Sequence, residues 1–254
     1  MNLKNKTILI TGASTGIGKA LAVELSKTNC KLILTARREN LIEEFRNELD
    51  LPDENILILK NDVSDKTNCK ETYSKIIEKF GGVDIAILNA GTGHTVTVEK
   101  YDSAWADKII GANLFGIIYW VEQLLPEFIN RKSGIIAGVS SLADNRGFSG
   151  SGFYSSSKAA ATIYLEGLRV ELAPYNVKVI TIRPGFVKTP LTDKNKYDMP
   201  FIMSAEKAAK IILKGIIKEK RLVQFPFGMV AITRLIGALP GSLYEFLAKK
   251  IKFR

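Results

Sequence analysis

The stretch TGASTGIGKA, residues 11–20, constrains the fold most, because it follows an apolar run and opens a helical pattern. Its glycines Gly12, Gly16 and Gly18 permit a tight turn, a close backbone approach and close helix packing. The free N–H groups at the start of a helix can then hold a pyrophosphate. The stretch predicts a dinucleotide-binding loop, and the alternative is a glycine-rich turn without a ligand.

The spacing of the same stretch excludes a nucleotide triphosphatase loop. Such a loop has four residues between its first glycine and the glycine that precedes its lysine, whereas five separate Gly12 from Gly18 here. Ala20 also stands where that loop carries its magnesium-binding hydroxyl.

Apolar runs alternate with amphipathic stretches along the chain. The runs are short and rich in Ile, Leu and Val, which is typical of parallel strands covered on both faces. The expected strands cover 6–11, 31–36, 55–60, 83–88, 134–139 and 177–182. The expected helices cover 17–29, 39–49, 67–80, 103–131 with a break, 153–174 and 204–219.

This order predicts the α/β class, with a single Rossmann-type doubly wound parallel sheet and helices on both faces. No linker or internal repeat interrupts the pattern, so we expect one domain over 1–254. Within it, the dinucleotide-binding core covers about 5–190, and a substrate loop with a C-terminal helical segment covers about 190–254.

The composition is that of a soluble globular chain, with 46% hydrophobic and 24% charged residues. No uncharged stretch approaches the ~20 apolar residues that span a bilayer. The N-terminus runs straight into a strand and lacks the layout of a signal peptide. Cys30 and Cys69 form neither a disulfide framework nor a metal-binding spacing. We therefore expect a reduced, cytoplasmic protein without a metal.

The chain has a net charge of +10, but its sequence contains no nucleic-acid recognition motif. We interpret most of it as a lysine-rich solvated surface and expect no nucleic-acid partner. The segment 218–254 differs, because it holds eight basic residues against two acidic ones.

The second expected strand ends in LTARRE. An NAD enzyme of this fold normally places a carboxylate there for the ribose hydroxyls, but this chain has Ala36, followed by Arg37 and Arg38. A guanidinium pairs with a 2′-phosphate and gains nothing from a bare hydroxyl. The pattern favours NADP(H), and the alternative is two surface arginines at the start of a helix.

The stretch YSSSK places Tyr154 and Lys158 one helical turn apart, on one face of the expected helix. Upstream, Ser140 and Ser141 end a strand. The tyrosine–lysine pair alone is a weak signal, because a lysine-rich chain produces such a pair by chance. A surface tyrosine beside a surface lysine is the alternative.

The glycine loop, the LNAG stretch at 88–91, the serine and YxxxK pair and the RPGFVKT stretch at 183–189 together resemble the short-chain dehydrogenase/reductase superfamily. They occur in the order of that family over about residues 5–190. The loop type and chain length match the branch that oxidises and reduces carbonyls and alcohols.

The resemblance implies a catalytic tetrad of Asn113, Ser141, Tyr154 and Lys158. The family's serine lies thirteen residues before its tyrosine, which selects Ser141 over Ser140.

The cofactor NADP(H) is expected to lie along the glycine loop and the strand ends. Asp62 is a candidate contact of the adenine amine, and the resemblance implies that the segment 184–189 cradles the nicotinamide. The expected cofactor-binding residues are Gly12, Ser14, Thr15, Gly16, Ile17, Gly18, Arg37, Arg38, Asp62, Val63, Asn89, Ala90, Gly91, Tyr154, Lys158, Pro184, Gly185, Val187 and Thr189.

Reduction of a ketone needs a hydride on carbon and a proton on oxygen. Tyr154 can give that proton if its phenolate is stabilised. The charges of Lys158 and of the oxidised nicotinamide favour the phenolate, so we expect the tyrosine pKa to fall from about 10. The resemblance implies that Ser141 orients the substrate oxygen and that Asn113 holds a water near Lys158.

Three loops, at 92–96, 142–153 and 186–203, should line the substrate pocket. Few fixed charges occur there, which favours an apolar or lipid-like carbonyl or alcohol as the substrate. Its apolar candidates are Leu142, Phe148, Phe153, Phe186, Leu191, Met199, Phe201 and Met203. We interpret His94, the only histidine, as an ordinary loop residue rather than a substrate contact.

The C-terminal segment departs from the pattern of the family. RLVQF at 221–225 is a candidate seventh strand, and two short apolar helices broken at Pro240 and Gly241 follow, with a basic tail. Three interpretations stay open. The helices cover the substrate pocket, or form a subunit interface of a homo-oligomer (dimer or tetramer), or lie on a membrane surface.

The sequence as a whole favours an NADP(H)-dependent carbonyl reductase or alcohol dehydrogenase. One alternative is a non-catalytic NADP-binding regulator on the same fold, against which the intact tetrad argues. Another is a lipid-metabolic ketoreductase at a membrane surface, which shares the chemistry but differs in substrate and location.

Overall fold

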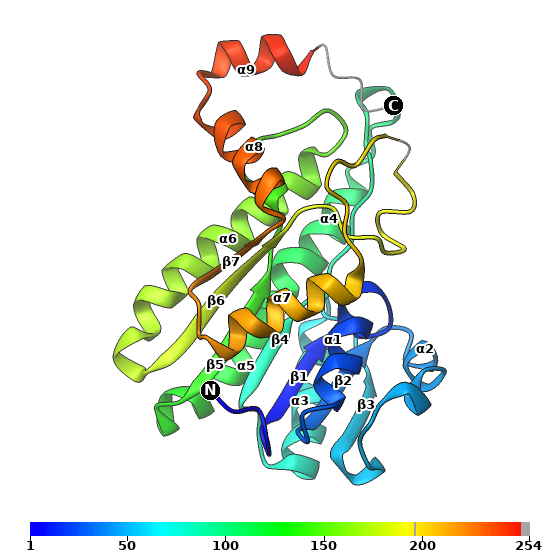
Figure 1. Cartoon of the computed structure of the whole chain (residues 1–254), viewed down its shortest axis with the longest axis vertical. Helices are drawn as coiled ribbons and strands as arrows, with labels where there is room; N and C mark the ends of the chain where they lie inside the picture. The colour runs from blue at the N-terminus through cyan, green and yellow to red at the C-terminus, as the bar shows by residue number, and fades with distance from the viewer. Residues whose placement is uncertain (196, 250–254) are drawn as a thin grey trace.

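The structure is a computed structural model that describes residues 1–195 and 197–249. In these residues a seven-stranded sheet has the order β3-β2-β1-β4-β5-β6-β7, and every neighbouring pair is parallel (Figure 1). The strands are β1 (Thr7–Thr11), β2 (Lys31–Ala36), β3 (Ile56–Lys60), β4 (Ile85–Leu88), β5 (Gly134–Val139), β6 (Val177–Pro184) and β7 (Leu222–Phe225). The doubly wound parallel sheet predicted from the sequence is confirmed.

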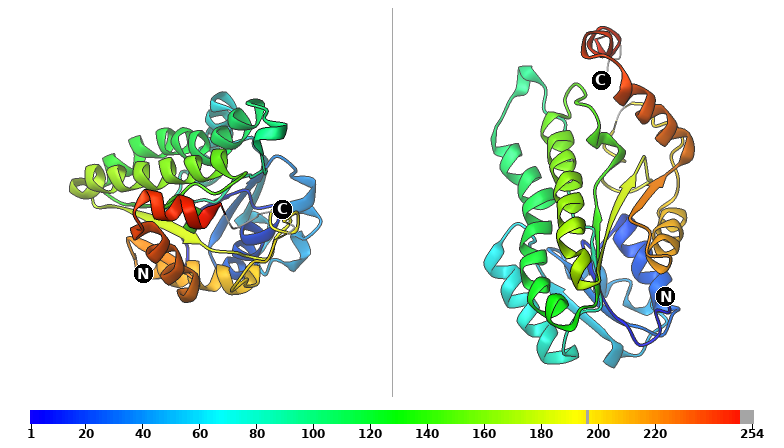
Figure 2. Two further views of the ribbon diagram at one scale, coloured as in Figure 1. Left: turned by 90° about the horizontal axis from the view of Figure 1, so that it is seen from above. Right: turned by 90° about the vertical axis from the view of Figure 1, so that its left-hand side faces the viewer.

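Helices cover both faces of the sheet (Figure 2). They are α1 (Gly16–Ser26), α2 (Asn40–Glu43), α3 (Lys66–Phe80), α4 (Ala104–Ile110), α5 (Gly116–Arg131), α6 (Gly152–Leu172), α7 (Ala205–Ile217), α8 (Phe227–Ala238) and α9 (Gly241–Ala248). Short 3-10 turns are η1 (Arg46–Glu48), η2 (Asp53–Asn55), η3 (Val98–Lys100), η5 (Leu142–Asp144) and η6 (Ala173–Tyr175), and η4 (Gly111–Phe115) is a π-helical turn.

Two apolar clusters fill the layers on either side of the sheet. Leu9 and Ile33 belong to the cluster under α3, α5 and α6, whereas Ile8, Ile10 and Leu32 belong to the cluster under α1 and α7. Alternate side chains of one strand therefore enter opposite apolar layers. This is why the strand sequences lack an apolar–polar alternation.

The helix expected over 39–49 is shorter than predicted. The backbone leaves the helix at Phe45, after α2, and continues as the turn η1. Ile42, Phe45 and Leu49 are nevertheless buried in the core. The apolar spacing that suggested a helix is satisfied by burial of the same side chains in an irregular backbone.

The break expected within 103–131 is a π-helical turn, η4, which joins α4 to α5 without interrupting the helix. The joined helix, 28 residues from Ala104 to Arg131, has a mean hydropathy of 1.3 over its most apolar window. It is the one described segment long and apolar enough to cross a bilayer, but it packs on the sheet with Trp120, Leu124 and Phe128 fully buried.

The strand order reverses between β1 and β4, where chain connections leave the sheet in opposite directions. In a doubly wound sheet the loops at such a point diverge and leave a crevice at the carboxyl ends of the strands. The candidate seventh strand is confirmed as β7 beside β6, and α8 follows directly from its carboxyl end.

Candidate active site

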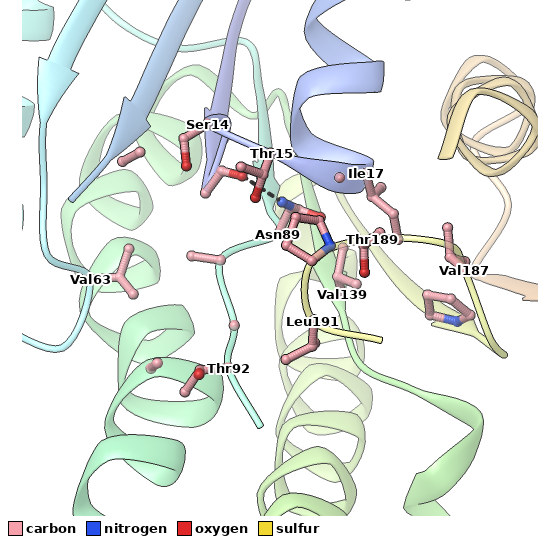
Figure 3. Close-up of a pocket in the computed structure, with 18 of the residues that line it drawn as sticks. Ser14, Thr15, Ile17, Val63, Asn89, Thr92, Val139, Val187, Thr189 and Leu191 are labelled. Atoms are coloured by element: carbon pink, nitrogen blue, oxygen red, sulfur yellow. Dashed lines mark hydrogen bonds between the residues drawn. The ribbon is translucent and has the colours of Figure 1, made fainter. Parts of the chain in front are cut away.

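A cleft opens at the carboxyl edge of the sheet, and residues at the ends of six strands, β1 to β6, line it. Figure 3 shows part of this lining. All of the residues predicted to bind the cofactor or to carry the chemistry line this cleft, except Gly18 and Asn113. The tertiary structure therefore brings together residues that lie as far apart in the chain as Gly12 and Thr189.

The glycine loop owes its shape to a close approach of two strand ends. A Cβ atom on Gly12, which has a φ of +66°, would lie 2.8 Å from the Cα of Ala90. A Cβ on Gly18 would lie 2.2 Å from the carbonyl oxygen of Gly12. Gly18 thus packs beneath the loop and does not line the cleft, so its predicted part in cofactor binding would be to shape the loop.

Asn89 holds the glycine loop in place from the end of β4. Its amide nitrogen donates to the carbonyl oxygens of Thr11 and Gly12, at 3.0 and 3.2 Å (Figure 3). The backbone N–H groups of Asn89 and Ala90 donate in turn to the hydroxyl of Thr11. The LNAG stretch is therefore a brace for the loop as well as part of the cleft wall.

At the other end of the cleft, Ala36 is buried and the side chains of Arg37 and Arg38 are exposed at its rim. Neither arginine pairs with a carboxylate among the described residues. The two guanidinium groups thus give this end of the cleft a positive charge.

Asp62 lies at the same end of the cleft and is held in a fixed turn. One of its carboxylate oxygens accepts hydrogen bonds from the N–H and the hydroxyl of Ser64, at 3.0 and 2.6 Å. Its own N–H donates to Asn68 at 2.8 Å. Its neighbour Asn61, which the sequence did not single out, is buried and accepts from the indole of Trp120.

Tyr154 and Lys158 lie in the first turns of α6 and line the cleft beside Gly91 and Gly93, in the loop after β4. The Lys158 side chain is buried, and its ammonium group donates to the carbonyl oxygen of Val139 at 2.9 Å. The ammonium lies 5.8 Å from the centre of the Tyr154 ring. Ser141 caps η5 by accepting from the N–H of Ala143, and it hydrogen-bonds to Tyr154.

Burial controls the protonation of both groups in the protein by itself. It raises the pKa of Tyr154, and the hydrogen bond with Ser141 lowers it by a smaller amount. Burial also lowers the pKa of Lys158 to about 8. The predicted fall of the Tyr154 pKa relies on the charges of Lys158 and of the oxidised nicotinamide, whereas in the chain by itself desolvation has the largest effect and acts in the opposite direction.

The two serines at the end of β5 have different roles. Ser140 is buried, and its hydroxyl donates to the backbone carbonyl of Lys158 at 2.8 Å. Ser141 is partly exposed in the cleft beside Tyr154. The geometry agrees with the choice of Ser141 as the residue nearest the reacting groups.

Asn113 lies behind the cleft, fully buried in the π-helical turn η4. Its amide oxygen accepts from the N–H of Thr92 at 2.8 Å, and its amide nitrogen donates to the carbonyl of Thr92 and the hydroxyl of Ser157, both at 2.9 Å. It therefore anchors the loop after β4. π-Helical turns of this kind occur frequently at functional sites.

Most of the apolar side chains expected around the substrate pack outside the cleft itself. Leu191 lines the cleft, whereas Leu142 and Met203 are buried and do not line it. Three aromatic pairs form around the cleft, between loop residues or between a loop and a helix: Phe148–Tyr244, Phe153–Tyr101 and Phe186–Tyr197. His94 stacks on Trp105 with 3.7 Å between ring centres and does not line the cleft.

The C-terminal helices dock on the loop that follows Ser141. The Arg146 guanidinium donates to the carbonyl of Gly237 at 3.0 Å and also to that of Leu239, at the end of α8. The Tyr244 hydroxyl in α9 donates to the carbonyl of Gly147 at 2.6 Å. These contacts favour the interpretation of α8 and α9 as a cover, and the basic tail 250–254 lies outside the described residues.

Several cleft residues carry no sequence signal that marks them. Val139, Ala112 and Thr192 line the cleft, and the Thr192 hydroxyl donates to the carbonyl of Val187 at 2.7 Å. Among the described residues, no group of three or more His, Cys, Asp or Glu side chains could hold a metal ion.

Comparison with known proteins places this chain among oxidoreductases. A family model described as short chain dehydrogenase matches residues 6–200. An uncharacterized oxidoreductase of Myxococcus xanthus is 33% identical over 247 residues, which cover 97% of this chain and 98% of that protein. An 11-beta-hydroxysteroid dehydrogenase-like protein of Arabidopsis thaliana is 34% identical over 235 residues, 90% of this chain and 75% of that protein.

Solved structures share the fold at lower identity. A short-chain dehydrogenase/reductase from Burkholderia phymatum, in complex with NAD, has a TM-score of 0.85 and 20% identity, and the match covers 100% of this chain and 98% of that one. A 3-ketoacyl-(acyl-carrier-protein) reductase from Brucella melitensis, complexed with NADH, has a TM-score of 0.81 and 24% identity over 90% of this chain and 99% of that one.

Proposed function

Because the chain belongs to the short-chain dehydrogenase/reductase family of oxidoreductases, we propose that it is an NADP(H)-dependent enzyme that interconverts a carbonyl group and a secondary alcohol on an apolar substrate. One observation carries the proposal. A single cleft holds Tyr154, Ser141 and Lys158 at one end and Arg37 with Arg38 at the other, with the glycine loop between them.

The cleft suits a dinucleotide by its shape. The close approach of Gly12 to Ala90 leaves the backbone of the loop bare, where a side chain would fill the space a pyrophosphate needs. When bound, the nicotinamide supplies or accepts the hydride. The residues Pro184, Gly185, Val187 and Thr189 would hold that half of the cofactor.

The residues of the chain move the proton. The Tyr154 hydroxyl donates its proton to the substrate carbonyl oxygen in the reducing direction. Ser141 offers a hydroxyl to the same oxygen as its charge develops. Lys158 provides a cation close to the phenolate that remains. A positive charge there favours the phenolate and so opposes the effect of burial.

The preference for NADP(H) is supported by the two guanidinium groups at the rim of the cleft. A 2′-phosphate accepts strong charge-assisted hydrogen bonds from arginine, and a ribose hydroxyl does not replace them. Ala36 leaves no carboxylate to bind the ribose hydroxyls of NAD or to repel a phosphate.

An apolar substrate is supported by the surroundings of Tyr154. Leu191 lines the cleft beside it, and a Cβ on Gly93 would lie 3.2 Å from the tyrosine ring and 3.7 Å from Leu191. The space above the tyrosine is thus bounded by apolar groups. The name of the Arabidopsis relative, 11-beta-hydroxysteroid dehydrogenase-like, favours a bulky apolar carbonyl for this chain as well.

Oxidation of NADPH in the presence of ketones and aldehydes of increasing size tests the function. We expect turnover that rises with apolar size and that Tyr154→Phe lowers by about 10²-fold or more, with NADPH binding retained. Tyr119→Phe, on α5 and away from the cleft, is the matched control. Retained activity in Tyr154→Phe would refute the assignment of the tyrosine.

Assembly and location stay predictions. We propose that α8 and α9 cover the substrate end of the cleft and that the chain forms a homo-oligomer in the cytoplasm. Exposed Phe227 and Leu235 on α8 keep a peripheral membrane contact as the alternative. Light scattering measures the oligomeric state. Co-sedimentation with anionic vesicles measures the membrane contact.

A further inference from the structure

An ion pair between Asp144 and Arg183 lies next to the proposed active site but outside the cleft. Asp144 ends the turn η5, three residues after Ser141, and Arg183 precedes Pro184 at the end of β6. The side chains of the pair are 2% and 13% exposed, respectively. The pair therefore ties the turn that begins at Ser141 to the strand end that carries Pro184.

A set of hydroxyl contacts extends from the same carboxylate to α6. The Thr162 hydroxyl donates to Asp144 at 2.6 Å, and its oxygen lies 2.7 Å from that of Ser140. The Ser140 hydroxyl donates to the backbone carbonyl of Lys158 at 2.8 Å. The carboxylate thus connects the turn after β5 to the helix that carries Tyr154.

Stability alone does not account for this ion pair. A buried pair loses its hydration, and replacing both partners by apolar residues is often neutral or stabilising. The pair is also imperfect, because the Nε of Arg183 is buried without a hydrogen-bond partner among the described residues. Its distinctive property is its position beside the groups proposed to transfer the proton.

The charge of Asp144 acts on both of those groups. The charged and titratable groups that face Tyr154 are Lys158 on α6, Asp144 on η5 and Tyr197 in the loop before α7. After burial, which has the largest effect, Asp144 raises the pKa of Lys158 and contributes to raising that of Tyr154. Arg183 is the cation that compensates this carboxylate.

We propose that the Asp144–Arg183 ion pair is a positioning element of the site: it fixes the Ser141 turn against α6 and sets the electrostatic field in which Tyr154 exchanges its proton. The proposal rests on the proposed function, because it assigns a role within the same site. Neither residue lines the cleft, so both act through the groups they hold.

The test is the pH dependence of kcat for carbonyl reduction in Asp144→Asn, Arg183→Gln and the double variant. Reduction needs protonated Tyr154, so the rate falls as the pH rises through its pKa. Loss of the carboxylate and an uncompensated Arg183 both lower that pKa, so in Asp144→Asn the fall moves to lower pH. An uncompensated carboxylate raises it, so in Arg183→Gln the fall moves to higher pH.

We expect each single change to reduce kcat by about tenfold, and the double variant to reduce it by about tenfold as well, rather than by the roughly hundredfold of two independent effects. Arg183→Lys, which keeps the charge, should keep the wild-type pH profile. The matched control is the exposed pair Lys66–Glu122, whose neutralisation should leave the pH profile unchanged.

The proposal is supported if the two single variants shift the pH profile of kcat in opposite directions and the double variant has the wild-type profile. Shifts in one direction, or none, in variants that bind NADPH and unfold cooperatively overturn it. If the single variants do not fold, the double variant decides: a kcat about tenfold below that of the wild type supports the proposal, and a wild-type kcat overturns it.

The failure of the proposed function is a separate result. The proposed function fails if the wild type reduces no carbonyl of the panel. In that case the ionisation of Tyr154 is followed by phenolate absorbance, with Tyr154→Phe as the blank. Opposite shifts of that ionisation in the two single variants support the role of the pair, and unshifted ionisation overturns it.

Discussion

The ammonium group of Lys158 donates a hydrogen bond to the carbonyl of Val139 at 2.9 Å, so the cation of the YxxxK pair is anchored to the end of β5. The hydrogen bond fixes a buried charge close to Tyr154, and no carboxylate among the described residues forms a salt bridge with it. The consequences of this burial can be measured.

The first prediction concerns the stability of the Lys158 site. Burial lowers its pKa from 10.5 to about 8, so the unfolded chain binds more protons between these two values. The buried Lys158 charge therefore lowers the free energy of unfolding by its full amount below pH 8. This destabilisation decreases as the pH rises from 8 to 10.5. Lys158→Met should raise the free energy of unfolding at pH 7 by roughly 2 kcal/mol, after the lost hydrogen bond to Val139 is subtracted.

Urea unfolding at pH 7 and pH 10 measures this effect. Lys75→Met, at an exposed position on α3, is the control and should change little at either pH. A Lys158→Met protein less stable than the wild type at pH 7 would show that the hydrogen bond outweighs desolvation.

The second prediction concerns the choice of cofactor. Changing Arg37 and Arg38 together to Ala removes the cations proposed to bind a 2′-phosphate. Hydrogen bonds to charged groups contribute about 1.5–3 kcal/mol, so the ratio of kcat/KM for NADPH over NADH should fall by roughly 10- to 100-fold. A wild type that prefers NADH would show that the argument from the two arginines is wrong.

The third prediction concerns Asn113 as an anchor. Asn113→Ala removes the partner of the N–H and the carbonyl of the partly buried Thr92, and a partner of the buried Ser157 hydroxyl. Unsatisfied polar groups cost about 1–3 kcal/mol each, so the free energy of unfolding should fall by at least about 2 kcal/mol. Asn130→Ala, exposed on α5, is the matched control in a denaturant titration. Equal midpoints for the two variants would contradict the anchoring role.

The fourth prediction concerns the C-terminal cover. Arg146→Ala removes the hydrogen bonds to the carbonyls at the end of α8. We expect proteolysis within 227–249 to become faster and KM for the carbonyl substrate to rise about tenfold, while NADPH binding stays unchanged. Arg234→Ala, exposed on α8, is the control. Unchanged KM with faster proteolysis would mean that the helices do not cover the substrate.

The sequence predicted the fold well because its signals are local. The glycine spacing from Gly12 to Gly18 and the short Ile, Leu and Val runs are enforced by contacts within a few residues or by burial on both faces. The helix expected over 39–49 failed because its apolar spacing is satisfied equally well by an irregular backbone that buries Phe45. Burial of the apolar side chains, rather than helical periodicity, determined the backbone conformation of residues 39–49.

Predictions of the site differed in quality for a similar reason. The places of Tyr154, Ser141 and Lys158 in the cleft followed from motifs, but the direction of the Tyr154 pKa did not. That pKa depends on how much water the surrounding loops exclude and on where the Lys158 ammonium points. The YxxxK spacing determines neither of these two quantities.

The amino-acid sequence by itself determined the parallel sheet, the family, and the position of the cleft at the carboxyl ends of the strands. These follow from patterns that a strand or a helix imposes on neighbouring residues. Only the tertiary structure brought Asp144 to Arg183 and Thr162, docked α8 on Arg146 and buried Lys158 against Val139. Such contacts join residues from different loops, and their energies depend on desolvation, which exists only once the chain has folded.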